Sequence, residues 1–125
     1  MQLTRENPGD RTYVRAVDEK GIRIGEDTHT TPLILSPGSI DTGWTVTSFE
    51  KLSKETLQPL LALEPEVVIV GTGRNQQFPD PSLLMPFHKA GIGIEIMNTP
   101  AACRTFNILV MEERKVVAGL IPLTA

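Results

Sequence analysis

The sequence predicts an α/β fold: a single compact domain in which helices pack against a mixed central β-sheet. Residues 67–70 form a continuous β-branched run, which is typical of a strand buried on both faces. From about residue 53, helical and strand patterns alternate, whereas the short alternating segments before it are typical of antiparallel strands. The expected order is therefore an antiparallel N-terminal meander followed by β-α-β-α-β, joined by right-handed crossovers.

Length and charge limit the possible classes of protein. The chain has 125 residues, so we expect residues 1–125 to form one domain, with residues 1–10 as a loose N-terminal segment. Its 12 Lys and Arg are scattered and its formal charge is −3, which argues against a nucleic-acid partner. Its apolar runs are far shorter than the roughly 20 residues that cross a bilayer, so no membrane insertion is expected. The start lacks a signal-peptide core and the chain has one cysteine, which predicts a cytoplasmic location.

The first half of the chain consists of short strand patterns separated by turns. Alternating apolar residues predict strands over residues 13–17, 22–24, 33–35 and 44–46, with residues 18–21 as a hairpin turn. This meander either extends the central sheet or covers it.

The first helix is expected over residues 53–63, with a buried leucine stripe. Pro59 is unfavourable six positions inside a helix that is capped at Ser53, because it removes a hydrogen bond and crowds the preceding turn. We therefore expect either a kink or a late start with Thr56 as the N-cap, which would place Pro59 in the first turn. The buried stripe consists of Leu57, Leu60 and Leu61.

Two further helices alternate with the strands expected over residues 66–70, 92–97 and 116–121. Asp80 and Pro81 are typical of a helix start, and Gly91 is typical of a helix end. The inward residues of this helix are Leu83, Leu84 and Phe87. Thr99 and Pro100 have the pattern of an N-cap and a first helical position for the last helix. Its core stripe consists of Ala102, Phe106, Leu109 and Val110.

Polar residues and glycines are expected to gather at one edge of the sheet. If strands 66–70 and 92–97 are parallel neighbours, their carboxyl ends meet there, beside the N-terminus of the last helix. Free N–H groups and the positive end of the helix dipole favour an anion at such a place. Arg104 and Asn107 lie three residues apart on the same helix. The candidate crevice comprises Gly71, Thr72, Gly73, Glu95, Asn98, Thr99, Arg104 and Asn107.

Each part of this crevice also has a structural interpretation. The segment 71–73 is no dinucleotide fingerprint, because Gln76 stands where a third glycine is needed, and G-T-G is more often a tight strand exit. Glu95 is either a tuned acid or, more often for such a residue, the partner of Arg104 or Arg114 on an inner strand. Arg104 is either a structural residue or an anion anchor.

No catalytic set, metal site or cofactor site is predicted. Cys103 has no histidine near it in sequence and is expected to be a buried thiol. His29 and His88 are far apart, and two histidines with one cysteine make no zinc site. His88 fits a contact with the carboxyl end of its helix.

The second half resembles a known family in two segments, V-V-I-V-G-T-G at residues 67–73 and the run from G-I-G-I-E-I-M-N-T-P to V-V-A-G-L at residues 91–120. The chain is similar to the small α/β domain family that includes mitochondrial respiratory complex I assembly factor 3 and an adipogenesis-associated cytosolic protein. The signature residues are Glu95, Thr99, Ala102, Arg104, Thr105, Asn107, Glu112 and Arg114. The resemblance implies a mixed sheet with packed helices, and because the family has no established catalytic mechanism, it assigns no catalytic residue to this chain.

Three hypotheses of function follow. The first is a non-catalytic interaction or assembly factor that acts on an unknown protein partner. The second is a binding protein or enzyme for an anionic metabolite, with Arg104 as the anchor and Glu95 as acid or base. The third is self-association through the loop around Phe78 or the edge of the meander.

Overall fold

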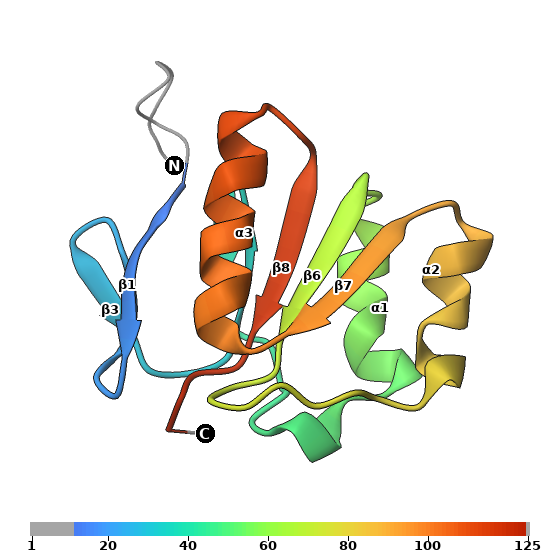
Figure 1. Ribbon diagram of the computed structural model, residues 1–125, viewed down its shortest axis with the longest axis horizontal. Helices are drawn as coiled ribbons and strands as arrows, with labels where there is room; N and C mark the ends of the chain where they lie inside the picture. The colour runs from blue at the N-terminus through green and yellow to red at the C-terminus, as the bar shows by residue number, and fades with distance from the viewer. Residues whose placement is uncertain (1–11, 125) are drawn as a thin grey trace.

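The computed structural model describes residues 12–124, and Figure 1 shows the order of its elements. The segment of residues 1–10, expected to be loose, lies outside the described residues. The strands are β1 (Val14–Asp18), β2 (Gly21–Ile24), β3 (Asp27–His29), β4 (Leu33–Ser36), β5 (Ser39–Asp41), β6 (Val67–Gly71), β7 (Gly93–Met97) and β8 (Val116–Leu120). The helices are α1 (Lys54–Ala62), α2 (Met85–Lys89) and α3 (Thr99–Met111), with short 3-10 turns η2 (Phe49–Lys51) and η3 (Pro81–Leu83).

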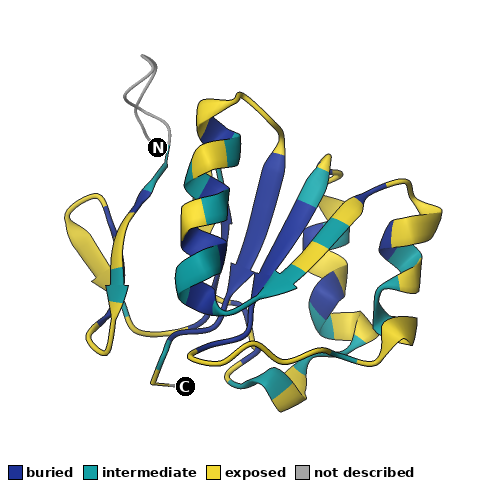
Figure 2. Cartoon of the chain, in the orientation of Figure 1, coloured by how far each residue is buried: buried dark blue, intermediate teal, exposed yellow. Residues whose placement is uncertain are grey.

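The main sheet has five strands in the order β5-β4-β8-β6-β7. Strand β6 pairs in parallel with both β7 and β8, while β4 is antiparallel to β8 and to β5. The predicted mixed α/β sheet is thus confirmed, as is the parallel pairing of the two strands that bound the crevice. Every residue of β8 is buried, which places β8 at the centre of the fold (Figure 2).

The meander divides between two sheets, so it both extends and covers the central sheet. Strands β1, β2 and β3 form a separate antiparallel sheet that packs beside α3 (Figure 1), and β4 and β5 join the main sheet. The predicted hairpin turn at residues 18–21 joins β1 to β2, with Asp18 paired to Gly21. The predicted strand at residues 44–46 is wrong, because Trp44 and Val46 enter the core from irregular chain.

Strand β6 separates two hydrophobic layers. Ile69 faces α3 and packs with Ala102 and Phe106, whereas Val68 and Val70 face the side of α1 and α2. Burial of alternate residues on opposite faces is what the continuous β-branched run predicts.

Trp44 fixes the approach of the α1 layer to β8. It is 5% exposed, and its indole N–H donates to the carbonyl of Thr56 at 2.8 Å. A Cβ at Gly119 on β8 would lie 2.6 Å from the indole ring, so the ring position requires a glycine at residue 119.

Helix α1 begins at the earlier of the two predicted starts. Ser53 is the N-cap, and its side chain and that of Thr56 accept each other's backbone N–H groups, forming a capping box. The late start at Thr56 is therefore wrong. Pro59 lies inside the helix on its exposed side, where its ring meets solvent instead of the core.

The single helix predicted between Asp80 and Gly91 is two shorter pieces, η3 and α2. Asp80 accepts the N–H of Ser82 as the expected cap, and Gly91 ends α2 with a φ of +74°. Pro86 explains the break, because it lacks the N–H that a continuous helix would donate back to the carbonyl of Ser82. Phe87 is buried as predicted, while Leu83 and Leu84 are half-buried.

Candidate functional site

The loop that follows β6 meets the N-terminus of α3 at the place that the sequence predicts. The N–H of Gly73 donates to the Thr99 hydroxyl at 2.8 Å, and the N–H of Thr99 donates to the carbonyl of Gly73 at 2.8 Å. The Thr99 hydroxyl in turn donates to the carbonyl of Ile121 at 2.6 Å, just after β8. Thr99 is completely buried. We call Gly71, Thr72, Gly73, Thr99 and Ile121 the Thr99 junction.

The Thr99 junction is closed by its own atoms. A Cβ on Gly71 would lie 2.8 Å from the Thr99 hydroxyl oxygen and 3.0 Å from the Thr99 Cα, so only a glycine allows this contact. Gly73 has a φ of +96°, a conformation that side chains other than glycine rarely adopt. This geometry matches the interpretation of G-T-G as a tight strand exit.

The free N–H groups expected at the start of α3 are absent. The N–H of Thr99 is bonded to Gly73, and Pro100 has none. The N–H of Ala101 donates to the Asn98 side chain at 2.9 Å, and that of Ala102 donates to the Asn98 carbonyl at 2.9 Å. The N-cap is thus Asn98, one residue before the predicted Thr99. An anion would find no unbonded amide here.

Asn107 points away from the Thr99 junction. Its side-chain oxygen accepts the N–H of Val14 at 2.9 Å, and its side-chain nitrogen donates to the carbonyl of Val14 at 2.8 Å. The amide therefore bonds β1 as a neighbouring strand would, and it fastens the three-stranded sheet to α3. Asn107 is a positioning residue for that sheet, and it does not line a common crevice with Gly71 and Thr99.

The charged members of the predicted crevice lie outside it. Glu95 is exposed on β7, which is an edge strand and not the inner strand expected. Arg104 is exposed on α3. Within residues 12–124, Glu95 takes part in no ion pair, and Arg114 pairs with Glu66 at 3.2 Å. The expected pairing of Glu95 with either arginine is therefore wrong.

Glu66 takes the role that was expected of Glu95. Its carboxylate accepts the backbone N–H of Lys115 at 2.8 Å and binds the Arg114 guanidinium. These two contacts, the backbone one foremost, hold the pKa of the Glu66 carboxyl below its usual value. The pair links the start of β6 to the start of β8, so its role is structural.

The chain beyond the Thr99 junction forms a braced, exposed loop. The Thr72 hydroxyl donates to the carbonyl of Asn75 at 2.6 Å, and the side chain of Gln76 donates to the Ile96 carbonyl at 2.9 Å. Arg74 forms an ion pair with Glu19 of the β1–β2 turn. We call residues 74–79 the Phe78 loop, because Phe78 lies in it with 75% of its surface exposed. The sequence singled out Phe78 only for self-association and gave no sign of these braces.

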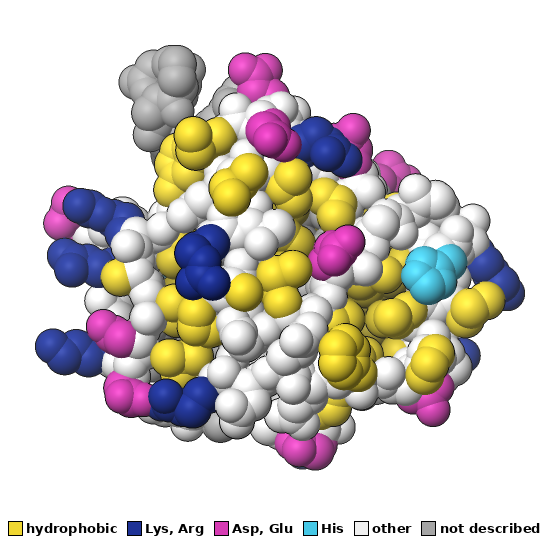
Figure 3. Space-filling model, in the orientation of Figure 1, with side chains coloured by type: hydrophobic (Ala, Val, Ile, Leu, Met, Phe, Trp, Pro, Cys, Tyr) yellow, Lys and Arg dark blue, Asp and Glu magenta, His cyan; other side chains and the backbone are white. Residues whose placement is uncertain are grey.

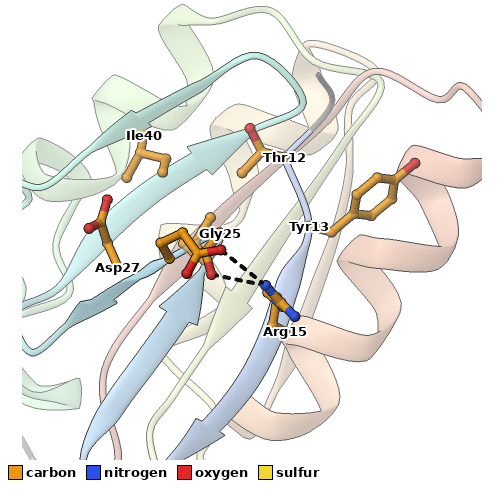
Figure 4. Close-up of a pocket in the computed structure, with 8 residues that line it drawn as sticks. Thr12, Tyr13, Arg15, Gly25, Asp27 and Ile40 are labelled. Carbon is orange, nitrogen blue, oxygen red and sulfur yellow. Dashed lines mark hydrogen bonds and ion pairs between the residues drawn. The ribbon is translucent and has the colours of Figure 1, made fainter. Parts of the chain in front are cut away.

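Two surface hollows lie on different parts of the described structure. A hollow of about 330 Å³ lies beside the Phe78 loop, between Thr72, Phe49 and Leu123. A larger one, of about 520 Å³, is lined by Arg15 and Asp27 from the small sheet and by Ile40 from β5 (Figure 4). Arg15 is already engaged there, since it bonds the carbonyl of Gly25 at 3.5 Å and lies 3.9 Å from the Glu26 carboxylate.

The metal-ligating side chains of the described residues form no cluster. Among them, no three His, Cys, Asp or Glu side chains are grouped so as to hold a metal ion. Cys103 is buried in the layer between α3 and the sheet, and this burial raises the pKa of its thiol to about 12. It is thus the buried thiol that was predicted. No helix within the described part of the chain is long and apolar enough to cross a membrane.

The fold defines the class of protein: a small α/β domain with a mixed central sheet. A crystal structure of a Bordetella parapertussis protein is similar, with a TM-score of 0.84 and 34% identity over 90% of this chain and 96% of that one. A solution structure from Bordetella pertussis, described as a Mth938-like domain, has a TM-score of 0.82 and 28% identity over 98% of this chain and 93% of that one. Residues 14–121 match the family described as protein of unknown function DUF498/DUF598, and the chain belongs to this family.

A relative with an informative name supports the predicted resemblance. The chain is 34% identical over 122 residues to the bovine (Bos taurus) protein named NADH dehydrogenase [ubiquinone] 1 alpha subcomplex assembly factor 3. The match covers 96% of this chain and 65% of the bovine protein, so the chain spans just under two thirds of that relative's length. The resemblance to the assembly-factor family is thereby confirmed.

Proposed function

We propose that this protein is a non-catalytic assembly factor that binds a protein partner through the Phe78 loop. The name of the bovine relative supports a role in assembly. The observation that carries the proposal is the contrast between a closed Thr99 junction and an aromatic side chain that is 75% exposed on a loop held at three points.

A braced aromatic side chain suits protein recognition. Burying a phenylalanine side chain that was exposed stabilises a complex by about 2 kcal/mol. Aromatic anchors of this kind dominate many protein interfaces. Because Thr72, Gln76 and Arg74 already hold the loop, binding would order little additional chain, and less of the interaction energy is lost to entropy.

Quantitative affinity capture from the native cell tests this function. Phe78→Ser should reduce recovery of the partner about 10- to 30-fold, the effect of losing about 2 kcal/mol. Leu63→Ser is the matched control, since Leu63 is 45% exposed at the end of α1 and should leave recovery unchanged. Equal recovery by wild type and Phe78→Ser would contradict the proposal.

The alternative function, binding of an anionic metabolite, lacks an observation in its favour because the amides at the start of α3 are bonded. It is tested by a thermal-shift screen of anionic compounds, in which Arg104→Ala would abolish any stabilisation. The cytoplasmic location expected from the sequence stays a prediction, and cell fractionation checks it.

A further inference from the structure

The outer face of α3 is unusual for a surface helix. Arg104 is the single charged side chain among its 13 residues. Ile108 is 54% exposed and Met111 is 69% exposed, and both lie on the same side of the helix as Arg104. The solvent side of a surface helix is ordinarily polar, whereas a helix that is apolar all round is ordinarily buried.

Figure 3 shows the face of the molecule that carries α3 and β7. Lys and Arg side chains gather at the side of the small sheet, while hydrophobic side chains gather over α3. The exposed apolar residues of α3, Ile108 and Met111, are distinct from the Phe78 loop, which belongs to the connection between β6 and α2. The outer face of α3 therefore lacks a cover within the described part of the chain.

The charges on this face are spaced symmetrically about Ile108. Arg104 lies four residues before Ile108, and Glu112, the C-cap of α3, lies four residues after it. Each charge is thus about 6 Å along the axis from Ile108. Both side chains are exposed, and within residues 12–124 neither takes part in an ion pair.

We propose that two copies of this chain pair through the outer faces of their α3 helices, antiparallel about a two-fold axis beside Ile108. In this arrangement Arg104 of each copy lies opposite Glu112 of the other, and Ile108 lies opposite Ile108. A two-fold contact requires a surface that is complementary to itself, and the equal spacing of opposite charges provides it. A parallel pairing would place like charges together and is disfavoured.

The helix face is small, so the dimer should be weak. A 13-residue helix is about 20 Å long and offers less area than the interfaces of permanent dimers. We expect a dissociation constant on the order of 10 µM. Sedimentation velocity detects such a dimer as a weight-average sedimentation coefficient that rises with protein concentration.

A charge exchange tests the antiparallel geometry directly. Arg104→Glu places two acidic side chains opposite each other at both contacts, and Glu112→Arg places two basic ones there. Each variant alone should weaken dimerisation at least 10-fold. Mixing the two variants should restore it, because every contact then joins opposite charges, and the double variant should dimerise like the wild type. Lys20→Glu, an equal charge change in the β1–β2 turn, should have no effect.

Other outcomes would overturn the dimer. They are a wild type that stays monomeric up to about 1 mM, single variants that dimerise normally, or a mixture that remains monomeric. A monomer whose partner capture is lost in Ile108→Asp would instead assign the face to another protein. Phe78→Ser should leave dimerisation unchanged, so the dimer and the proposed function can fail separately.

Discussion

The Thr99 junction and the Phe78 loop are neighbours in sequence with opposite character. In the junction, the hydroxyl of Thr99 joins the Gly73 amide to the Ile121 carbonyl, so these polar groups bond one another. A few residues later, Phe78 is largely exposed. The difference shows that the polar residues at the carboxyl edge of this sheet hold the loop in place, and it leaves Phe78 as the exposed side chain on which the proposed recognition rests.

The largest expected effect comes from filling the space that Gly71 leaves. Gly71→Ala should destabilise the protein by about 3 kcal/mol, because the new Cβ would lie 3.0 Å from backbone and 2.8 Å from the Thr99 hydroxyl. Chemical denaturation measures the change in the free energy of unfolding. Gly38→Ala is the control, since no atom lies within 4 Å of a Cβ there. If Gly71→Ala and Gly38→Ala had the same free energy of unfolding, the contact between residue 71 and Thr99 would not be tightly packed.

A slightly smaller effect is expected from removing the Thr99 hydroxyl. Thr99→Val keeps the shape of the side chain but leaves the Gly73 N–H and the Ile121 carbonyl without their buried partner. The free energy of unfolding should fall by about 2 kcal/mol. Thr99→Ser keeps the hydroxyl and should recover much of this loss. If Thr99→Val were as stable as the wild type, water would have to reach the junction and bond the Gly73 N–H and the Ile121 carbonyl.

The smallest effect on stability is expected at Phe78. Phe78→Ser should change the free energy of unfolding by less than about 0.5 kcal/mol, because the side chain is exposed and packs against little. The same denaturation measurement applies. A loss comparable to that of Thr99→Val would mean that Phe78 is part of the fold, and the contrast between the two regions would fail.

The sequence predicts the main parts of the fold because their signals are local. The β-branched run of β6 and the glycine that ends α2 each show their role within a few residues. The division of the meander could not be predicted, because it depends on pairing between β4 and β8, whose paired residues are 83 to 87 positions apart in the sequence. The broken helix was predictable from Pro86, whose effect the periodic pattern of apolar residues hides.

The sequence predicts where the loop after β6 meets the start of α3, but it does not predict that the polar groups there bond one another. Parallel pairing of β6 and β7 brings Gly73 to Thr99, as expected. The closure depends on a third segment, since the Ile121 carbonyl arrives only because β8 lies beside β6. The same strand order leaves β7 at the edge and Glu95 in solvent, and no local pattern specifies that order.

The contact between Trp44 and Gly119 gives the protein an internal optical reporter. Trp44 is the single tryptophan of the chain, and it is almost fully buried on the α1 side of the sheet. Its emission should therefore shift to longer wavelength only when that layer separates from β8. Since α3 packs on the opposite face of the sheet, the fluorescence should report unfolding and should not change when a second copy binds the outer surface of α3.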